Sequence, residues 1–169
     1  MELWDAYDKD GNLLDFKLVR GEEIAAGVYH IVCEALVRHT DGDFLLMKRA
    51  MSKEAYPGFY EATCGGSALV GETPDICIKR ELFEETGIRA ENFEHYMFNL
   101  YDDGAALYHS YIVNTDWPKE KITLQEGETE GFKWVNKEEF MRFIASDEAI
   151  DTQVKRWIPY LEREGLIKT

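Results

Sequence analysis

Three glutamates, Glu81, Glu84 and Glu85, are spaced so that one helix face can carry all of them. At 100° per residue they fall within an arc of about 100°. Three carboxylates on one face repel each other unless a cation joins them, and their hard oxygen atoms select Mg²⁺ or Mn²⁺ over zinc. We therefore expect a divalent-metal site on this face, with the three glutamates as ligands.

Residues near these glutamates favour the same site. Gly66 and Gly71 allow unusual backbone dihedral angles and a close approach of the preceding loop to the helix. Gly66 is therefore included among the expected metal-site residues. Arg80 adjoins the acidic face, and we expect its guanidinium to pair with one carboxylate and fix that carboxylate's direction.

The segment Gly66 to Ile88 reads GSALVGETPDICIKRELFEETGI. Taken alone, a glutamate-rich helix is usually a solvated face. This segment, however, resembles at every defined position the Nudix box, which fixes the spacing of two glycines, four glutamates, an arginine and two aliphatic residues. The matching residues are Gly66, Glu72, Arg80, Glu81, Leu82, Glu84, Glu85, Gly87 and Ile88.

The resemblance to the Nudix family implies a fold and an activity. The fold is of the α/β class, an α/β/α sandwich in which helices flank a mixed sheet. The activity is a Mg²⁺-dependent (or Mn²⁺-dependent) pyrophosphohydrolase that cleaves a nucleoside diphosphate linked to another group. The box glutamates would hold the metal against a small-molecule diphosphate, and water would attack phosphorus while the metal neutralises the developing charge. Arg80, Glu81 and Glu84 would be catalytic, and a homodimer is common in such domains.

The N-terminal half has a narrower resemblance, to isopentenyl-diphosphate isomerase and its hydrolase-like relatives. It rests on Trp4-Asp5, Arg20-Gly21-Glu22, Tyr29-His30 and the run Arg49-Ala50-Met51-Ser52-Lys53. In that branch, Arg49 and Lys53 would lie near the substrate diphosphate, and local bases would offset the field of an acidic protein. Cys64 falls where the isomerase carries its catalytic cysteine.

Two departures argue against an isomerase. The isomerase has a metal-binding histidine two residues after its cysteine, where this chain has Gly66. Its helix also lacks some of the box glutamates, whereas this helix has all of them. A hydrolase is the favoured interpretation. An isomerase-type enzyme and a non-catalytic diphosphate-binding module remain the alternatives.

One acidic residue outside the box is also a candidate. The segment Ile122 to Glu130 is rich in glutamate and precedes a predicted strand. Such a loop is often only a solvated turn. Relatives commonly carry a glutamate six residues before a tryptophan, here Glu128 before Trp134, and a loop carboxylate reaching the site would act as general base or extra metal ligand. Glu128 is therefore the fourth expected catalytic residue.

The elements that position these residues follow from local patterns. Thr73 as N-cap, Pro74 in the first turn and Gly87 as terminator predict a helix over Thr73 to Thr86. Ile76 with Phe83, and Ile78 with Leu82, should give it apolar flanks. Further helices are expected from Asn136 to about Ile144 and over Thr152 to Glu164. Strands are expected over residues 3–7 and 13–19 (an N-terminal β-hairpin), 28–39, 44–48, 59–64, 93–101, 107–113 and 132–135.

Length and composition limit the possible domain organisation, partners and compartment. The 169 residues suggest a single domain over 1–169. There are 33 acidic and 19 basic residues, giving a net charge of -14, which argues against nucleic-acid and anionic-membrane partners. No apolar run approaches the ~20 residues that span a bilayer. Three widely spaced cysteines and an acid near the N-terminus predict a cytoplasmic protein with neither disulfides nor a zinc site.

Overall fold

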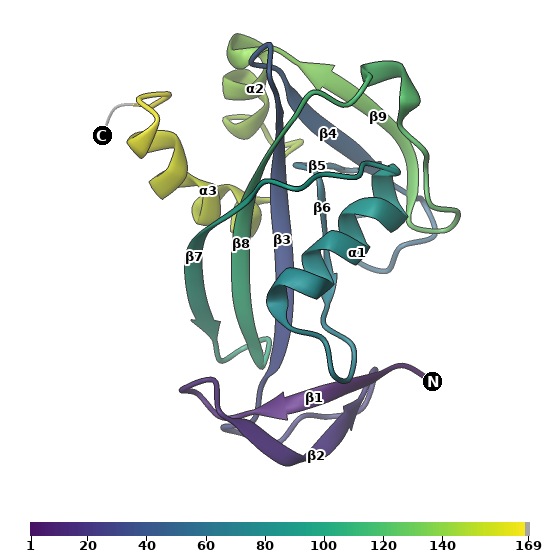
Figure 1. Ribbon diagram of the computed structural model, residues 1–169, viewed down its shortest axis with the longest axis vertical. Helices are drawn as coiled ribbons and strands as arrows, with labels where there is room; N and C mark the ends of the chain where they lie inside the picture. Colours follow the sequence, from purple (N-terminus) through teal and green to yellow (C-terminus); the bar gives the residue numbers. More distant parts are fainter. Residues whose placement is uncertain (168–169) are drawn as a thin grey trace.

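The computed structural model describes residues 1–167, which form two sheets and three α-helices (Figure 1). Strands β1 (Leu3–Tyr7) and β2 (Leu13–Val19) form the predicted antiparallel hairpin. The large sheet has the order β5-β4-β3-β8-β7, with β6 added to β3 and β9 to β4. Its strands are β3 (His30–His39), β4 (Phe44–Arg49), β5 (Tyr60–Glu61), β6 (Cys64–Ser67), β7 (Phe93–Tyr101), β8 (Ala106–Thr115) and β9 (Thr129–Val135).

The large sheet is mixed, as predicted, and mostly antiparallel. Only β3 and β8 run parallel, in register from His30 opposite Ala106 to His39 opposite Thr115. The other edge of β3 is shared: its first half pairs with β6, and Arg38 near its end pairs with β4. The sheet therefore divides between β6 and β4, next to Gly66, where the segment from Gly66 to Ile88 begins.

Alternate side chains of β3 pack into two different cores. Cys33, Ala35 and Val37 pack in a core with residues of α1 (Pro74–Thr86). Leu36 points to the other face and packs with residues of α2 (Lys137–Ile144) and α3 (Asp151–Arg163). Helices thus cover both faces of the sheet, and Figure 1 shows α1 on the face opposite α2 and α3. This confirms the expected α/β/α sandwich. No helix within residues 1–167 combines the length and apolar composition needed to cross a bilayer.

Helix α1 begins and ends where its sequence predicts. The Thr73 side chain accepts a hydrogen bond from the Ile76 N–H at 3.4 Å. Gly87 adopts φ 75°, and its N–H donates to the Phe83 carbonyl at 2.8 Å. The expected apolar flank of Ile76 and Phe83 is wrong, because these side chains are 51% and 43% exposed. The Phe83 ring lies instead under the Arg89 guanidinium, 4.1 Å away, at the surface.

The single strand expected over residues 59–64 is also wrong, because the chain turns within it. β5 ends at Glu61, and β6 begins at Cys64. Between them Thr63 adopts φ 76°, which is unusual for a β-branched residue. Its buried hydroxyl accepts a hydrogen bond from the Val37 N–H at 2.9 Å and donates one to the Leu45 carbonyl at 3.0 Å. These bonds hold the turn and direct β6 away from β5.

The N-terminal hairpin is attached to the region around the acidic helix. Tyr7 and Tyr29 exchange backbone hydrogen bonds at 2.8 and 2.9 Å. The Trp4 ring stacks on buried His30 with centroids 4.1 Å apart, so His30 is a packed residue. The Gly71 N–H donates to the Asp5 carboxylate at 2.6 Å. The hairpin therefore lies beside the loop that precedes α1 (Figure 1).

Candidate active site

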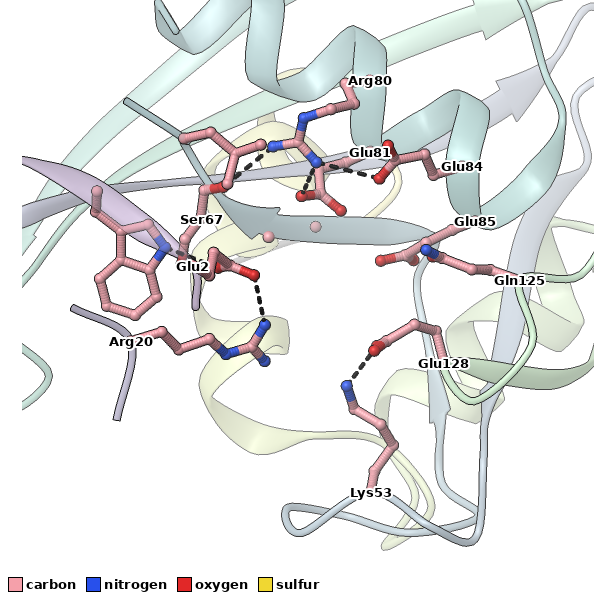
Figure 2. Close-up of a pocket in the computed structure, with 14 residues that line it drawn as sticks. Glu2, Arg20, Lys53, Ser67, Arg80, Glu81, Glu84, Glu85, Gln125 and Glu128 are labelled. Carbon is pink, nitrogen blue, oxygen red and sulfur yellow. Dashed lines mark hydrogen bonds and ion pairs between the residues drawn. The ribbon is translucent and has the colours of Figure 1, made fainter. Parts of the chain in front are cut away.

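A cavity of about 420 Å³ opens beside the acidic face of α1 (Figure 2). Its walls come from the hairpin, the loop after β4, β6, α1 and the loop before β9. The structure thus brings together segments that are distant in the sequence. The lining residues are Glu2, Trp4, Arg20, Lys53, Gly65, Gly66, Ser67, Leu69, Arg80, Glu81, Glu84, Glu85, Gln125 and Glu128.

Arg80 organises the acidic side of this cavity. Its Nε lies 2.7 Å from an oxygen of Glu72, and its Nη1 lies 2.6 Å from Glu81 and 3.2 Å from Glu84. Its Nη2 also donates to the Ser67 carbonyl at 3.1 Å. Hydrogen bonding from Arg80 lowers the pKa of Glu72. We expected one carboxylate partner, and the structure shows three, because the loop before α1 folds back over the helix.

Gly66 is in close contact with Glu81. A Cβ atom at position 66 would lie 2.5 Å from Cδ of Glu81, so only glycine leaves room for the carboxylate in this position. The close approach that we expected is therefore present. The positive φ is found at Gly71 (83°) and not at Gly66. The Gly66 carbonyl accepts a hydrogen bond from Sγ of Cys77, 3.6 Å away on α1.

Glu85 is the most buried of the three helix glutamates. It is 6% exposed, whereas the Glu84 side chain is 41% exposed. No cationic side chain within residues 1–167 pairs with Glu85. Burial, and then the nearby charges of Glu61, Glu81 and Glu128, raise the pKa of Glu85 well above its usual range. An acid buried among other acids is unfavourable unless a cation compensates it.

This donor set fits a hard divalent cation. Arg80 contacts one oxygen each of Glu81 and Glu84, which leaves their second oxygens available, and Glu85 lacks a counterion. Carboxylate oxygens of this kind are the ligands that Mg²⁺ and Mn²⁺ prefer. Within residues 1–167 the side chains are not already gathered in a metal-binding arrangement. Cation binding would therefore require these carboxylates to move closer together.

The wall facing α1 carries Lys53 and Glu128, which form an ion pair (Figure 2). The Glu128 carbonyl accepts a hydrogen bond from the Ala50 N–H at 2.9 Å, which fastens the loop before β9 to the end of β4. The structure thus places Lys53 and Glu128 in the same cavity as the helix glutamates.

Arg49 is not part of this wall. Its Nη1 lies 3.1 Å from both oxygens of Glu61, and its Nε donates to the Ala55 carbonyl at 3.1 Å. It lines a smaller, adjacent cavity. Arg49 and Lys53, which we expected to act together, therefore face different spaces.

The hairpin side of the cavity was not predicted. Nη1 of Arg20 lies 3.0 Å from a Glu2 oxygen, and the other Glu2 oxygen accepts from Nε1 of Trp4 at 2.8 Å. In Figure 2, Arg20 and Glu2 occupy the side away from Gln125 and Glu85. Trp4 and Arg20 belong to the segments that resemble the isomerase branch, which was the only signal in the sequence. No local pattern indicates where a hairpin will dock.

Cys64 and Cys77 are both buried. Cys64 packs in the core beneath α1, and burial raises the pKa of its thiol well above the usual range. Cys77 contacts the Gly66 carbonyl from within α1. Both environments are those of packed thiols.

Comparison with known proteins identifies the family. The NUDIX domain model matches residues 28–158. An uncharacterized Nudix hydrolase of Listeria monocytogenes is 30% identical over 156 residues, covering 89% of each chain. Isopentenyl-diphosphate Delta-isomerase of Corynebacterium diphtheriae is 36% identical, but over only 59 residues, which is 35% of this chain and 32% of the isomerase. The similarity to the isomerase branch is therefore local.

Solved structures share the fold. The DR0079 protein of Deinococcus radiodurans has a TM-score of 0.73 at 19% identity, covering 92% of this chain and 98% of that one. A bifunctional NMN adenylyltransferase/ADP ribose pyrophosphatase of Francisella tularensis, complexed with AMP and a Mn ion, has a TM-score of 0.59 at 22% identity, covering 80% of this chain and 42% of that one. With the family model matching well over half of its length and the Listeria relative matching almost all of it, the chain belongs to the Nudix hydrolases, enzymes that act on phosphoanhydride bonds.

Proposed function

We propose that this protein is a Mg²⁺-dependent pyrophosphohydrolase, with Mn²⁺ as a substitute metal, and that its substrate is a small diphosphate linking a nucleoside or similar group to a second group. The observation that supports this most strongly is that four carboxylates line one cavity: those of Glu81, Glu84, Glu128 and the buried Glu85. Such a concentration of carboxylates suits a metal-bridged phosphate and repels a free one.

Glu81, Glu84 and Glu85 are the proposed metal ligands, with the Gly66 carbonyl as a further oxygen donor. When bound, the cation neutralises negative charge on the diphosphate. Arg80 acts by positioning, because its guanidinium holds Glu81 and Glu84 in fixed directions. A manganese ion in the Francisella neighbour is compatible with this choice of metal.

Glu128 is the proposed general base. A carboxylate at the cavity wall can accept a proton from a water molecule as the water oxygen attacks phosphorus and the phosphoanhydride bond breaks. The ion pair with Lys53 aims Glu128 into the cavity. Lys53 also offers a cation to the substrate phosphates, whereas Arg49, which is paired with Glu61, contacts the substrate from the adjacent space.

The isomerase alternative is weaker on structural grounds. A histidine at position 66, which the isomerase needs as a metal ligand, would collide with the Glu81 carboxylate. The Cys64 thiol is buried in the core beneath α1, and it borders only the smaller adjacent cavity, not the main cavity that holds the helix glutamates. A module that only binds diphosphates does not require the complete set of box glutamates that this chain retains.

The proposal is tested by incubating the protein with Mg²⁺ and a panel of nucleoside diphosphate derivatives and separating the products chromatographically. We expect cleavage by the wild type, and at least a 100-fold lower kcat/KM for Glu84→Gln and Glu85→Gln, a loss of about 3 kcal/mol of transition-state stabilisation. Glu91→Gln, at an exposed position just after α1, is the matched control. Wild-type rates in both site variants would refute the metal assignment.

A further inference from the structure

A second cavity, of about 170 Å³, adjoins the proposed active site. Gly65 and Gly66 line both cavities, so the two spaces meet at a segment without side chains. The second cavity lies where the sheet divides between β6 and β4. It belongs to the α3 side of the sheet, because Gln153 and Arg156 of α3 form part of its wall.

One wall is a buried ion pair. Nε and Nη2 of Arg156 donate to the two oxygens of Glu34 at 2.7 and 2.6 Å, and both side chains are 6% exposed. The Ser110 hydroxyl also donates to Glu34 at 2.7 Å. The Arg156 guanidinium lies over the Tyr108 ring, 4.4 Å from its centroid. Buried ion pairs contribute little net stability, so stability alone does not explain this arrangement.

The opposite wall contains an unpaired acceptor. Nε2 of Gln153 donates to Glu61 at 3.2 Å, which fixes the orientation of the amide. Its Oε1 is buried and has no donor among residues 1–167. Arg49, which pairs with Glu61 through Nη1, has no acceptor for Nη2 among the same residues. An acceptor buried without a partner destabilises the protein, and a suitable ligand group would recover that cost.

We propose that this second cavity binds a hydroxyl-bearing group, a sugar or a polyol, attached to the diphosphate that the acidic face holds. A hydroxyl both donates and accepts, so it can donate to Oε1 of Gln153 and accept from Nη2 of Arg49. This inference rests on the proposed function and specifies its substrate class.

Other occupants fit the cavity less well. Val32, Cys33 and Cys64 also line the cavity, but an isoprenoid tail would bury the rest of its apolar surface against two ion pairs. A phosphate would meet the carboxylates of Glu34 and Glu61, which already neutralise both arginines. A nucleobase would need an open aromatic face for stacking, and Arg156 covers the Tyr108 ring. The cavity volume is roughly that occupied by six molecules of liquid water, which suits a single small ring.

The test compares two substrates of one nucleoside diphosphate, its sugar ester and its methyl ester, in the presence of Mg²⁺. We expect the wild type to favour the sugar ester by at least tenfold in kcat/KM, because an unpaired polar site discriminates strongly against a ligand without the partner group. Gln153→Met keeps the side-chain length and removes the acceptor. It should lose about tenfold in kcat/KM on the sugar ester, and with it most of the wild-type preference for that ester. Thr152→Val, at an exposed neighbour on α3, is the matched control.

The outcomes separate the two proposals. If no diphosphate is cleaved, the proposed function is refuted. If both esters are cleaved equally well, or if Gln153→Met retains the wild-type preference, the sugar assignment is refuted and the hydrolase assignment stands. Should Gln153→Met fail to fold, a deoxygenated sugar ester tested on the wild type decides the question, because full activity on it would refute the assignment.

Discussion

Replacing Glu85 by glutamine should make the metal-free protein more stable and nearly inactive. The carboxyl group is 6% exposed and has no cationic partner within residues 1–167, and its pKa is raised by burial and by neighbouring carboxylates. Glutamine keeps the shape and removes the charge. A stabilising effect of a catalytic-site substitution is expected where function holds an unfavourable group in place.

The sign and the size of this stability change follow from proton linkage. Because the pKa of Glu85 is raised in the folded state, the folded protein binds a proton that the unfolded chain has lost between the ordinary carboxyl pKa of 4.5 and the raised value. Stability therefore falls as pH rises through this window, by at most about 1.4 kcal/mol per pH unit. Relaxation and water entry reduce this limit, so we expect Glu85→Gln to gain about 1 kcal/mol at pH 7.5. That corresponds to a rise of roughly 2–4 °C in melting temperature.

Thermal unfolding in EDTA at pH 5.0 and pH 7.5 measures the effect, with Glu91→Gln as control. The advantage of Glu85→Gln should be larger at pH 7.5. Adding Mg²⁺ should raise the melting temperature of the wild type and should affect the variant less, because binding to the folded state stabilises it. Equal melting temperatures in EDTA at pH 7.5 would refute the reasoning that Glu85 is an uncompensated buried acid.

Three further predictions concern residues around the site. Because burial lowers the pKa of His30 from 6.5 to about 4, wild-type stability measured by urea unfolding should fall by up to roughly 3 kcal/mol as pH drops through that window, and His30→Gln should flatten the dependence. Gly66→Ala should lower kcat at least tenfold in steady-state assays because it displaces Glu81, and full activity would show that the contact is unimportant. Cys64→Ala should keep most hydrolysis and melt slightly lower, by roughly 1 kcal/mol, whereas complete loss of activity in a folded variant would favour the isomerase.

Local sequence signals predicted most elements of the fold. Thr73, Pro74 and Gly87 determine where α1 begins and ends through bonds within a few residues of each other. The hairpin strands β1 and β2 have the predicted bounds for the same reason. The break between β5 and β6 could not be predicted, because it depends on Thr63 bonding to two other strands.

The candidate site was likewise predicted only where local geometry decides the arrangement. The spacing of the box predicts that Glu81, Glu84 and Glu85 share a helix face, since helix geometry alone decides it. The burial of Glu85 and the threefold pairing of Arg80 depend on loops folding over α1, and spacing does not encode these. The separation of Arg49 from Lys53 depends on Glu61 in β5, and the sequence does not reveal that this strand pairs with β4.

The hairpin gives a physical reason to treat the chain as one functional unit. The NUDIX model begins at residue 28, yet Glu2, Trp4 and Arg20 line the main cavity. Trp4 stacks on His30 at the start of β3, so the hairpin's contribution depends on a contact with the region that the NUDIX model matches. A helix that holds a diphosphate through a metal recognises a group common to many substrates. Selection among those substrates must then come from walls such as the hairpin and the second cavity, which contact the groups beyond the phosphates.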